Sequence, residues 1–494
     1  KPLPGAAAHP ILSFDDETLK TTKISEMIAL YGPTVGTTPG RSCEDDFGNG
    51  LVNRWRDTKE TYCSPDGANL GTVGGHKSSI DCYLVKQTKH GGNGDQICVM
   101  ENVGVNMDIF NDDNLMYQTV RGYESTKHQK QPYVKFPPGF VRSACETRKD
   151  KWKSSLMPGW NNEWTVGAVS PVKGSEDVEC DEWIDEPVLI DQRDTFANFF
   201  HDSEDFVNVF LAMGVLEMSA ADTQIYLTDL YPEGPFWDMW KKPFGLVRDT
   251  MTAWALKKRF GHTGKEKKTT CYKKLIVGIY GPASPLTVCS WDTKCRSSAL
   301  VKAYSDFVIR GMGLQAHSHY ASATPSKEIH ILYMARRSSS QWPEKRFCDD
   351  KNSFFLCDIW KDWGLRSLQR TMKNEDKLLE TLKELENHTF KNGAKVIVRD
   401  VDYNLLTFED QIKIDLQTDI MIGPHGAGLM HSLFMRDRAA LVELFVDGSG
   451  ANRHFHNMAY WYGRQYQSVS GSLDPQRLLP IVRSIVEGMD LDGY

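Results

Sequence analysis

Short apolar runs alternate along this chain with longer segments in which apolar residues recur every three or four positions. The runs are typical of buried strands and the longer segments of amphipathic helices. The runs predict strands at 186–191, 224–229, 274–279, 329–335, 395–399, 418–422 and 439–445. The longer segments predict helices at 196–211, 235–260, 374–386, 407–416 and 474–489. Strands that alternate with helices indicate a parallel, doubly wound sheet, which binds ligands at the carboxyl ends of its strands.

The amino-terminal part of the chain has a different pattern. The first 190 residues are rich in Gly, Asn, Asp and aromatic residues, and their hydrophobic periodicity is poor. We expect an irregular region there, held together by disulfides. The pattern changes after Cys271, which divides the chain into an amino-terminal part, 1–270, and a carboxyl-terminal part, 271–494. The last helix, 474–489, is a candidate to pack back on the amino-terminal part.

Composition restricts the class of protein. The chain has 494 residues, 40% of them hydrophobic, and a formal net charge of −7, which argues against broad nucleic-acid binding. No apolar run approaches the roughly 20 residues needed to span a membrane. Because Lys1-Pro2 is not a natural start, we expect either a membrane anchor or a signal sequence upstream of it.

Cysteine usage points to an oxidising compartment. The chain has 11 cysteines in dispersed positions without a CxxC pair, which speaks against structural zinc and favours disulfides. The odd number leaves at least one cysteine unpaired or paired outside the chain. A single glycosylation sequon, Asn387-His-Thr389, fits the same secretory compartment.

The most informative segment runs from Thr418 to His431. An apolar run breaks at Gly423-Pro424 and passes through His425-Gly-Ala-Gly428 into a second apolar run with helical spacing. A strand, a tight glycine turn and a helix present backbone N–H groups and the positive end of a helix dipole to a ligand. We therefore predict a phosphate or diphosphate site at Gly426, Ala427 and Gly428.

Two further side chains belong to this predicted nucleotide site. Glu443, near the end of the next strand, is placed to accept hydrogen bonds from ribose hydroxyls. His425, inside the turn, is predicted to contact the diphosphate or the sugar. Its role in catalysis or in positioning stays open, and a simple helix cap is the alternative.

Arginines that follow a predicted strand supply positive charge. Arg336 and Arg337 end the run at 329–335, and Arg370 precedes Asn374, the predicted cap of a helix, by about one turn. Guanidinium groups at such positions bind a diphosphate with bidentate hydrogen bonds. We predict this role for Arg336, Arg337 and Arg370, with Asn374 beside them. The alternative is a solvated basic edge.

A polar cluster on the predicted helix at 196–211 is the candidate acceptor side. Asn198, His201, Glu204 and Asp205 have three- and four-residue spacing, which places them on a shared face of a helix otherwise rich in Phe and Val. The functional interpretation is that Asp205, acting directly or through His201, is a general base, with Asn198 and Glu204 beside the acceptor, and the family resemblance described below favours it. A cap with a salt bridge is the alternative.

A metal site is not predicted. Asp400-Val-Asp402 has the form of a metal-binding DxD motif, but such triplets arise often by chance and we interpret this one as structural. The sequence also contains no GxSxG, no P-loop lysine motif and no HExxH.

The residues quoted above resemble the glycosyltransferases of family 61. The resemblance lies in Ile422-Gly-Pro-His-Gly-Ala-Gly-Leu429, Glu443, Arg336-Arg337, Arg370 with Asn374, and Asn198-Phe-Phe-His201 with Asp205. It implies a GT-B architecture with two Rossmann-like lobes, inversion at the anomeric carbon and no bound metal or other cofactor.

The amino-terminal half resembles one group within that family. Arg41-Ser-Cys-Glu44 with Phe47-Gly-Asn-Gly50 is similar to the plant-type N-glycan core β-1,2-xylosyltransferases, and the segments 461–466 and 471–475 agree. Two features depart from the family pattern. Pro424 replaces a small residue, and 348–362 resembles an insertion closed by Cys348 and Cys357.

The resemblance implies an enzyme of the Golgi lumen, with a type II membrane topology. It would move xylose from UDP-xylose to O2 of the core β-mannose of an N-glycan and would bind no nucleic acid. The alternatives are a family 61 enzyme that uses UDP-N-acetylglucosamine or UDP-arabinose on a protein or polysaccharide, and a catalytically inactive carbohydrate-binding relative.

The absence of a predicted metal site has a direct test. Activity should be fully retained in EDTA, because arginines and backbone N–H groups supply the positive charge that a diphosphate requires. Sugar transfer is measured with and without the chelator, in the wild type and in Asp400→Ala and Asp402→Ala. A manganese requirement, with activity lost in either variant, would contradict this prediction.

Overall fold

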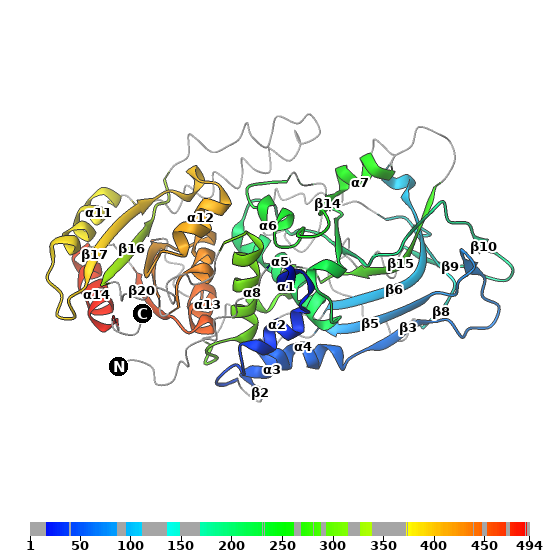
Figure 1. Cartoon of the computed structure of the whole chain (residues 1–494), viewed down its shortest axis with the longest axis horizontal. Coiled ribbons are helices and arrows are strands. Elements are labelled where there is room, and N and C mark those ends of the chain that lie inside the picture. The colour runs from blue at the N-terminus through cyan, green and yellow to red at the C-terminus, as the bar shows by residue number, and fades with distance from the viewer. Residues whose placement is uncertain are drawn as a thin grey trace.

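The computed structural model describes residues 16–38, 41–85, 95–110, 136–148, 168–229, 231, 233–260, 268–279, 281–287, 293–314, 327–337, 372, 374–437, 439–446, 452–470, 475–489 and 491. The molecule is elongated, with one sheet toward each end and helices between them (Figure 1). Both sheets are rich in parallel strands, so the mixed α/β class expected from the alternating pattern is found.

The carboxyl-terminal sheet has five strands, all parallel, in the order β17-β16-β18-β19-β20. The strands are β16 (Glu328–Met334), β17 (Lys395–Val401), β18 (Ile420–Pro424), β19 (Ala440–Phe445) and β20 (Gln465–Ser470). In chain order this arrangement is 2-1-3-4-5, a doubly wound order whose switch point lies between β16 and β18. Neighbouring residues alternate between the two faces: Ile331 and Tyr333 pack under α11 (Glu375–Lys383) and α14 (Pro475–Gly488), and Leu332 faces the centre of the molecule.

The amino-terminal sheet is mixed. Its parallel part has the order β14-β13-β12-β15, and antiparallel β6, β5, β3 and β8 extend it beyond β15. The parallel strands are β12 (Val188–Asp191), β13 (Gln224–Leu227), β14 (Met251–Thr252) and β15 (Thr269–Val277). Because β12 has β13 on one side and β15 on the other, the strand order reverses between β12 and β15, which makes a second switch point.

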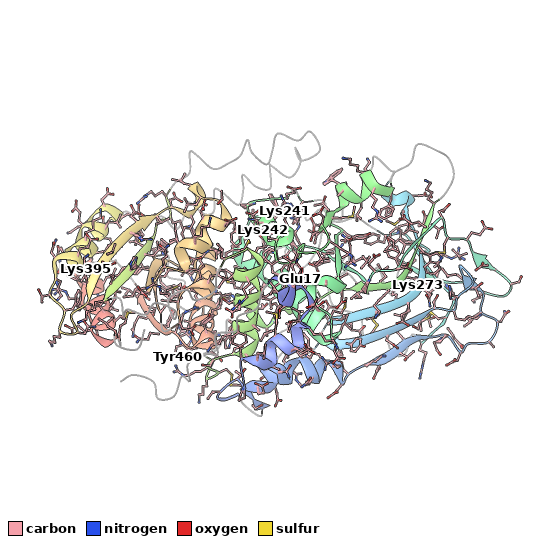
Figure 2. All side chains as sticks on the ribbon, viewed as in Figure 1. Glu17, Lys241, Lys242, Lys273, Lys395 and Tyr460 are labelled. Atoms are coloured by element: carbon pink, nitrogen blue, oxygen red, sulfur yellow. A yellow bond between two sulfur atoms is a disulfide. The ribbon has the colours of Figure 1, made fainter. Side chains whose placement is uncertain are left out.

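One apolar cluster lies between the sheets and contains side chains from both, including Leu189 and Ile276 of one sheet and Leu332 and Leu441 of the other. The helices around it come from both halves of the chain: α5 (Phe199–Val215), α6 (Trp237–Lys241), α8 (Ala299–Gly311), α12 (Phe408–Asp415) and α13 (His454–Tyr462). Lys242, at the end of α6, forms an ion pair with Glu409 of α12 across this junction (Figure 2). The two halves therefore share a continuous core.

The first 190 residues are more regular than expected. Their described part contains four α-helices, the long antiparallel strands of the amino-terminal sheet and several short strands. The helices are α1 (Asp16–Thr21), α2 (Ile24–Leu30), α3 (Cys43–Phe47) and α4 (Asn49–Arg56). The strands are β1 (Thr37–Thr38), β2 (Arg41–Ser42), β3 (Glu60–Ser64), β4 (Thr72–Val73), β5 (Ser79–Val85), β6 (Asp95–Asn106), β7 (Val141–Ser143), β8 (Glu146–Thr147), β9 (Val169–Pro171), β10 (Asp177–Val178) and β11 (Glu182–Ile184). The expectation of an irregular region was wrong. Polar residues on the outer strands obscure the alternation of apolar and polar positions by which strands are recognised in a sequence.

The expected disulfides are present among the described residues. They join Cys43 to Cys295, Cys63 to Cys145, Cys82 to Cys98 and Cys180 to Cys271. The first of these fixes α3 to the segment before α8, 252 residues further along the chain. Four disulfides fit a lumenal or secreted protein. Cys289 and the predicted loop closed by Cys348 and Cys357 lie outside the described residues.

Several boundaries differ from the prediction. The helical region expected at 235–260 is divided into α6, β14 and α7 (Ala253–Phe260), and the apolar run after the glycine turn is a 3-10 helix, η11 (Ala427–Phe434). A lobe boundary at 270/271 falls inside β15, which belongs to the amino-terminal sheet. The final helix, α14, packs against α11 in the carboxyl-terminal core instead of returning to the amino-terminal lobe. Within the described ranges, none of the helices has the length and apolar content needed to cross a bilayer.

Candidate functional site

Arg336 and the glycine turn lie at the switch point of the carboxyl-terminal sheet. Arg336 follows β16, the turn follows β18, and these strands are neighbours. Nη1 of Arg336 donates a hydrogen bond to the carbonyl of His425 at 3.2 Å. The structure thus brings together two segments 89 residues apart that the sequence assigns to one anion site.

Glycines at this turn make room for neighbouring side chains. A Cβ atom on Gly426 would overlap Nη1 of Arg336, and one on Gly428 would lie 2.6 Å from Sδ of Met334. Gly426 therefore lets the guanidinium lie directly against the turn. Ala427 begins η11 between these glycines. This close approach is the geometry in which an arginine and backbone N–H groups hold a phosphate together.

Glu443 is occupied by side chains of the protein itself. It is fully buried, its Oε1 lies 2.5 Å from Nδ1 of His425, and its Oε2 accepts a hydrogen bond from the hydroxyl of Tyr466 at 2.6 Å. In this arrangement Glu443 orients the turn histidine. Direct contact with ribose, the role predicted from the sequence, stays a prediction.

Arg337 has a different environment from Arg336. Its guanidinium pairs with Asp400 at 2.6 Å and with Glu375 at 3.0 Å. Asp402 accepts a hydrogen bond from the Asn404 N–H in the next 3-10 turn. Both acids of the DxD triplet therefore have local partners, in agreement with their structural interpretation.

Asn374 is exposed and precedes α11 without making a side-chain cap. Arg370 lies outside the described residues. Their predicted contacts with a diphosphate stay predictions.

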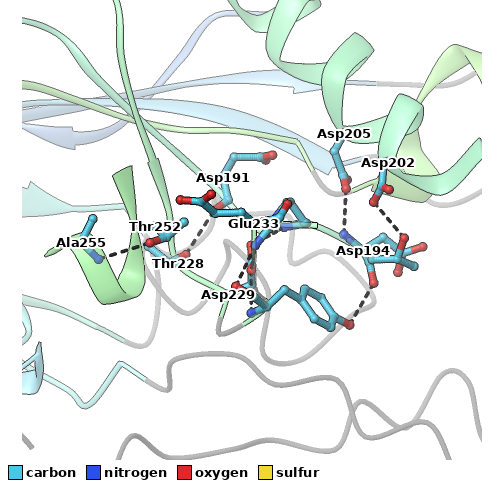
Figure 3. Close-up of polar contacts among 12 residues, drawn as sticks. Asp191, Asp194, Asp202, Asp205, Thr228, Asp229, Glu233, Thr252 and Ala255 are labelled. Atoms are coloured by element: carbon cyan, nitrogen blue, oxygen red, sulfur yellow. Dashed lines mark hydrogen bonds and ion pairs between the residues drawn. The ribbon is translucent and has the colours of Figure 1, made fainter. Parts of the chain in front are cut away.

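An acid cluster occupies the switch point of the amino-terminal sheet. It contains buried carboxyl groups from the ends of β12 and β13 and from the first turns of α5: Asp191, Asp194, Asp202, Glu204, Asp205 and Asp229. In Figure 3, Asp202 and Asp205 point from α5 toward the Asp194 segment. Buried Arg193 compensates one of these charges through a bidentate pair with Asp229, at 2.7 and 3.1 Å.

His201 is the partly exposed member of this cluster. Its Nδ1 lies 3.0 Å from Oδ2 of Asp194 and 3.0 Å from Oε2 of Glu204, and Thr287 donates to the other oxygen of Glu204 at 2.6 Å. Burial disfavours the imidazolium, but the hydrogen bonds to the two acids outweigh it and hold the pKa of His201 well above its usual value. A proton therefore compensates the two carboxylates.

The same three side chains are the described set that could hold a metal ion, since their ligand atoms lie within 4.8 Å of one another. A histidine nitrogen with two carboxylates suits a divalent transition metal. Such an ion would replace the proton on His201. The chelation test separates these two states.

Asp205 lies deeper than the sequence suggests. It is fully buried, and its Oδ2 accepts a hydrogen bond from the backbone N–H of Asp194 at 2.8 Å. Burial first, and then the charges of Asp191 and Asp194, raise the pKa of Asp205 well above its usual range. Asn198 caps α5 by accepting from the Phe200 N–H at 3.2 Å. Helical spacing thus placed His201 beside Glu204, and Asp194, which contacts both His201 and Asp205, comes from outside the helix.

Asp194 was missed by sequence reasoning. Asp194 contacts both His201 and Asp205. It lies three residues after β12, outside α5, so helical spacing could not reveal it. The available signal was its position, because polar residues just after a parallel strand lie where such sheets bind ligands.

A second missed residue, His454, joins the two centres. Its ring packs on Phe200 with centroids 4.3 Å apart, and Phe200 is adjacent to His201. On the donor side, the next residue, Phe455, packs on His425 with ring centroids 5.5 Å apart. Packed aromatic rings therefore connect the acid cluster with the glycine turn through Phe200, His454 and Phe455.

The motif that resembles the xylosyltransferase group has a structural role. Ser42 caps α3, Cys43 is in a disulfide, and Phe47 packs on Trp461 at 4.7 Å. Glu44 accepts from the N–H groups of Thr34 at 2.6 Å and Gly50 at 3.0 Å. The motif builds the α3–α4 corner and does not lie at either polar centre.

Comparison with known families finds a match within the carboxyl-terminal half of the chain. Residues 304–442 match the model of the family described as Glycosyltransferase 61. The matched region runs from α8 to β19 and includes Arg336 and the glycine turn. A glycosyltransferase of family 61 is therefore supported, in agreement with the resemblance in sequence.

The chain is also similar to EGF domain-specific O-linked N-acetylglucosamine transferases. That of Drosophila melanogaster is 25% identical over 324 residues, which cover 62% of this chain and 51% of the relative. That of Xenopus laevis is 26% identical over 302 residues, 60% of this chain and 47% of the relative. That of Bos taurus is 25% identical over 320 residues, 64% and 50% respectively. The chain thus spans about half the length of the curated relatives it matches.

The two neighbouring arginines should differ in their effect on nucleotide binding. Arg336→Ala should weaken UDP binding by about 1.5–3 kcal/mol, the contribution of hydrogen bonds to a charged group. Arg337→Ala should have a smaller effect, because Asp400 and Glu375 already engage that guanidinium. Calorimetric titration with UDP compares the two, with Arg370→Ala in parallel. Equal affinities of the wild type and a folded Arg336→Ala would remove Arg336 from the site.

Stability should rise as the pH is lowered from 8 to 6.5. Burial, and then repulsion from Asp229, raises the pKa of Asp191 to about 8, and the pKa of Asp205 is also raised. Unfolded aspartates titrate near 3.9, so the folded state binds more protons in this range. This stabilisation is complete below the unfolded pKa and is lost as pH rises through the folded pKa. The raised pKa of His201 acts in the same direction.

The lower limit of this window is set by His454. Burial lowers its pKa to about 4, so its contribution to stability is lost as pH falls below 6.5, the usual value for histidine. Melting temperatures of the wild type and of Asp191→Asn, measured across the window, test the prediction. Asp191→Asn should raise the melting temperature at pH 8 and flatten the slope. A wild-type melting temperature that falls toward pH 6.5 would refute it.

Proposed function

We propose that this chain is an inverting glycosyltransferase that moves a sugar from a UDP-linked donor to a hydroxyl group of a glycoprotein or glycan. The observation that carries the proposal is the pairing of two switch points. One presents Arg336 and a glycine turn, which suit a diphosphate, and the other presents an acid cluster around His201, which suits proton transfer. Phe200 and His454 connect the two centres. Such a two-lobed arrangement fits the GT-B type.

The proposed reaction has one displacement step. The acceptor oxygen bonds to the anomeric carbon as its proton passes to the acid cluster, and the bond from that carbon to the diphosphate oxygen breaks. UDP leaves with the electron pair, and attack opposite to it inverts the configuration. Arg336 and the N–H groups of the turn stabilise the leaving charge, so the proposal includes no metal or other cofactor.

We assign the proton acceptor to Asp205, acting either directly or through His201. His201 is the member of the cluster that is partly exposed, and Asp205 lies behind it with its carboxyl group on the Asp194 backbone. Asp194 and Glu204 fix the ring of His201. A carboxyl group with a raised pKa is a stronger base once it is ionised.

We propose N-acetylglucosamine as the transferred sugar and a serine or threonine hydroxyl of a folded protein as the acceptor. The support is the group of relatives, whose names describe O-linked N-acetylglucosamine transfer to EGF domains. The second candidate is transfer of xylose from UDP-xylose to the core β-mannose of an N-glycan. It is supported by the Arg41-Ser-Cys-Glu44 resemblance, a motif that lies away from the two polar centres.

The proposed compartment is the Golgi lumen or an adjoining part of the secretory pathway. Four disulfides require an oxidising environment. The sequon residue Asn387 is exposed at the end of a 3-10 turn, where a glycan could be attached.

A donor panel tests the proposal. UDP-N-acetylglucosamine, UDP-xylose and UDP-arabinose are each offered with a folded EGF domain and with an N-glycan acceptor, and product is detected by mass spectrometry. We expect N-acetylglucosamine on the EGF domain. Xylose on the N-glycan would establish the second candidate instead, and UDP binding with neither transfer nor donor hydrolysis would indicate an inactive scaffold.

Replacement of the proposed base should slow catalysis without loss of donor binding. Asn at position 205 keeps an oxygen that can accept the Asp194 N–H, so Asp205→Asn should fold normally and bind UDP as the wild type does. Its kcat should fall by roughly 10²–10⁴, the usual contribution of a general base. His201→Ala should resemble it if the two residues act as a unit.

The opposite outcome is also informative. A near-normal rate for Asp205→Asn, with an unchanged melting temperature, would make the acid cluster structural. Glu204 and His425 would then be the next residues to substitute.

A further inference from the structure

Three side chains of types that bind metal ions meet at the first turns of α5. Nδ1 of His201 lies 3.0 Å from Oδ2 of Asp194 and 3.0 Å from Oε2 of Glu204, and the three ligand atoms all lie within 4.8 Å of one another. His201 and Glu204 are three residues apart on one face of α5, and Asp194 comes from the segment after β12. An ion placed between these atoms would contact all three residues.

The spacing of these atoms suits a tetrahedral divalent ion. Zn²⁺ binds histidine nitrogen and carboxylate oxygen at about 2.0–2.2 Å, so two of its ligand atoms lie roughly 3.3–3.5 Å apart. The two contacts of the imidazole are only slightly shorter, so small shifts of the side chains admit the ion. One nitrogen and two carboxylates favour a transition-metal ion, because Mg²⁺ and Ca²⁺ prefer ligand sets made of oxygen alone.

Contacts outside the three ligands hold them in place. Thr287 donates to Oε1 of Glu204 at 2.6 Å, while Oε2 lies against the imidazole. The backbone around Asp194 is fixed on both sides: its N–H donates to Asp205 at 2.8 Å, and its carbonyl accepts from the hydroxyl of Tyr231 at 3.1 Å. Partners of this kind orient the ligands of metal sites and increase their affinity.

The charge of the cluster favours a cation, and the imidazole gives access to it. Two further buried carboxyl groups, those of Asp202 and Asp205, accept hydrogen bonds from neutral donors, which leave their negative charge in the cluster when they are ionised. The His201 side chain is 24% exposed, whereas its two carboxylate partners are 2% and 1% exposed. An ion from solvent would therefore enter beside the imidazole.

We propose that Asp194, His201 and Glu204 form a binding site for a divalent transition-metal ion such as Zn²⁺, and that the bound ion inhibits sugar transfer. The inhibition rests on the proposed function, in which the acid cluster takes up the proton of the acceptor hydroxyl. Two positive charges in this cluster repel that proton, because a bound metal ion strongly reduces the proton affinity of its ligands and their neighbours. Zinc should consequently slow catalysis without weakening the binding of UDP at Arg336 and the glycine turn.

The first measurement is metal binding to the full chain, which does not depend on activity. Calorimetry with ZnCl₂ should give one ion per chain, and Co²⁺ in its place should give the visible absorption of a low-coordinate site. Glu204→Gln keeps an oxygen for Thr287 but replaces a carboxylate ligand with an amide, and His201→Ala removes the nitrogen ligand. Both variants should lose the ion and the absorption.

A matched control removes a histidine that lies outside the cluster. His76 is exposed, and its ring contacts Trp183. His76→Ala should therefore bind zinc as the wild type does. Melting temperatures without metal show whether each variant is folded.

The second measurement compares sugar transfer by zinc-loaded and zinc-free enzyme after the free ion has been removed. The kcat of the loaded enzyme should fall by roughly 10²–10⁴, the contribution of the general base that the ion disables. EDTA should restore the rate, and UDP affinity should be equal in both forms. Mg²⁺ and Ca²⁺ should leave kcat unchanged, because the site lacks the oxygen ligands they require.

The metal site is refuted if the wild type binds no zinc, or if zinc binding persists unchanged in folded Glu204→Gln and His201→Ala. Its inhibitory role is refuted if the zinc-loaded enzyme transfers sugar as fast as the zinc-free enzyme or faster. A zinc-free wild type that transfers no sugar from any donor of the panel would refute the proposed function, and the inhibition with it. The binding measurement decides the metal site in that case as well.

Discussion

A single apolar core, packed between the inner faces of the two sheets, fixes how the carboxyl edges of those sheets meet. Strand residues such as Leu189 and Leu332 enter this core from opposite sides, and α5 and α8 fill the space between them. Because close-packed interiors transmit small displacements, the distance from the glycine turn to the acid cluster depends on this packing. The chemistry proposed for the molecule is possible only while that distance is held.

The acid cluster is a costly arrangement that the surrounding structure maintains. Six carboxyl groups are buried around one arginine and one histidine, and desolvation is the leading cause of the raised pKa of Asp191, Asp202 and Asp205. Burial of this kind lowers stability at neutral pH unless protons or partners compensate the charge. Shifted pKa values at the end of parallel strands are typical of functional sites, where stability is given up for reactivity.

Two sequence features have structural roles that differ from the roles predicted for them. Arg41-Ser-Cys-Glu44 supplies a helix cap, a disulfide and a buried carboxylate that holds backbone N–H groups, so its presence reports a fold detail more than a donor sugar. Glu443 supports His425 from behind. Residues that are distinctive of a family can therefore support the fold around a site without contacting a ligand. A donor sugar inferred from such residues needs separate support.

The sequence by itself determined four strands of the carboxyl-terminal sheet, β16 to β19, the glycine turn and the helix that carries His201 and Asp205, but it did not reveal β20. These depend on local signals: apolar runs, cap residues such as Thr407, and three- or four-residue spacing, all of which act within about one element. Only the tertiary structure decided that Arg336 contacts the glycine turn while Arg337 pairs with Asp400. It also decided that Asp194 contacts His201 and that His454 packs on Phe200 of α5. These contacts join segments that lie apart in sequence, and strand order and core packing select them. No local sequence pattern encodes strand order or core packing. Neighbouring residues of the same type, such as Arg336 and Arg337, can therefore have different roles.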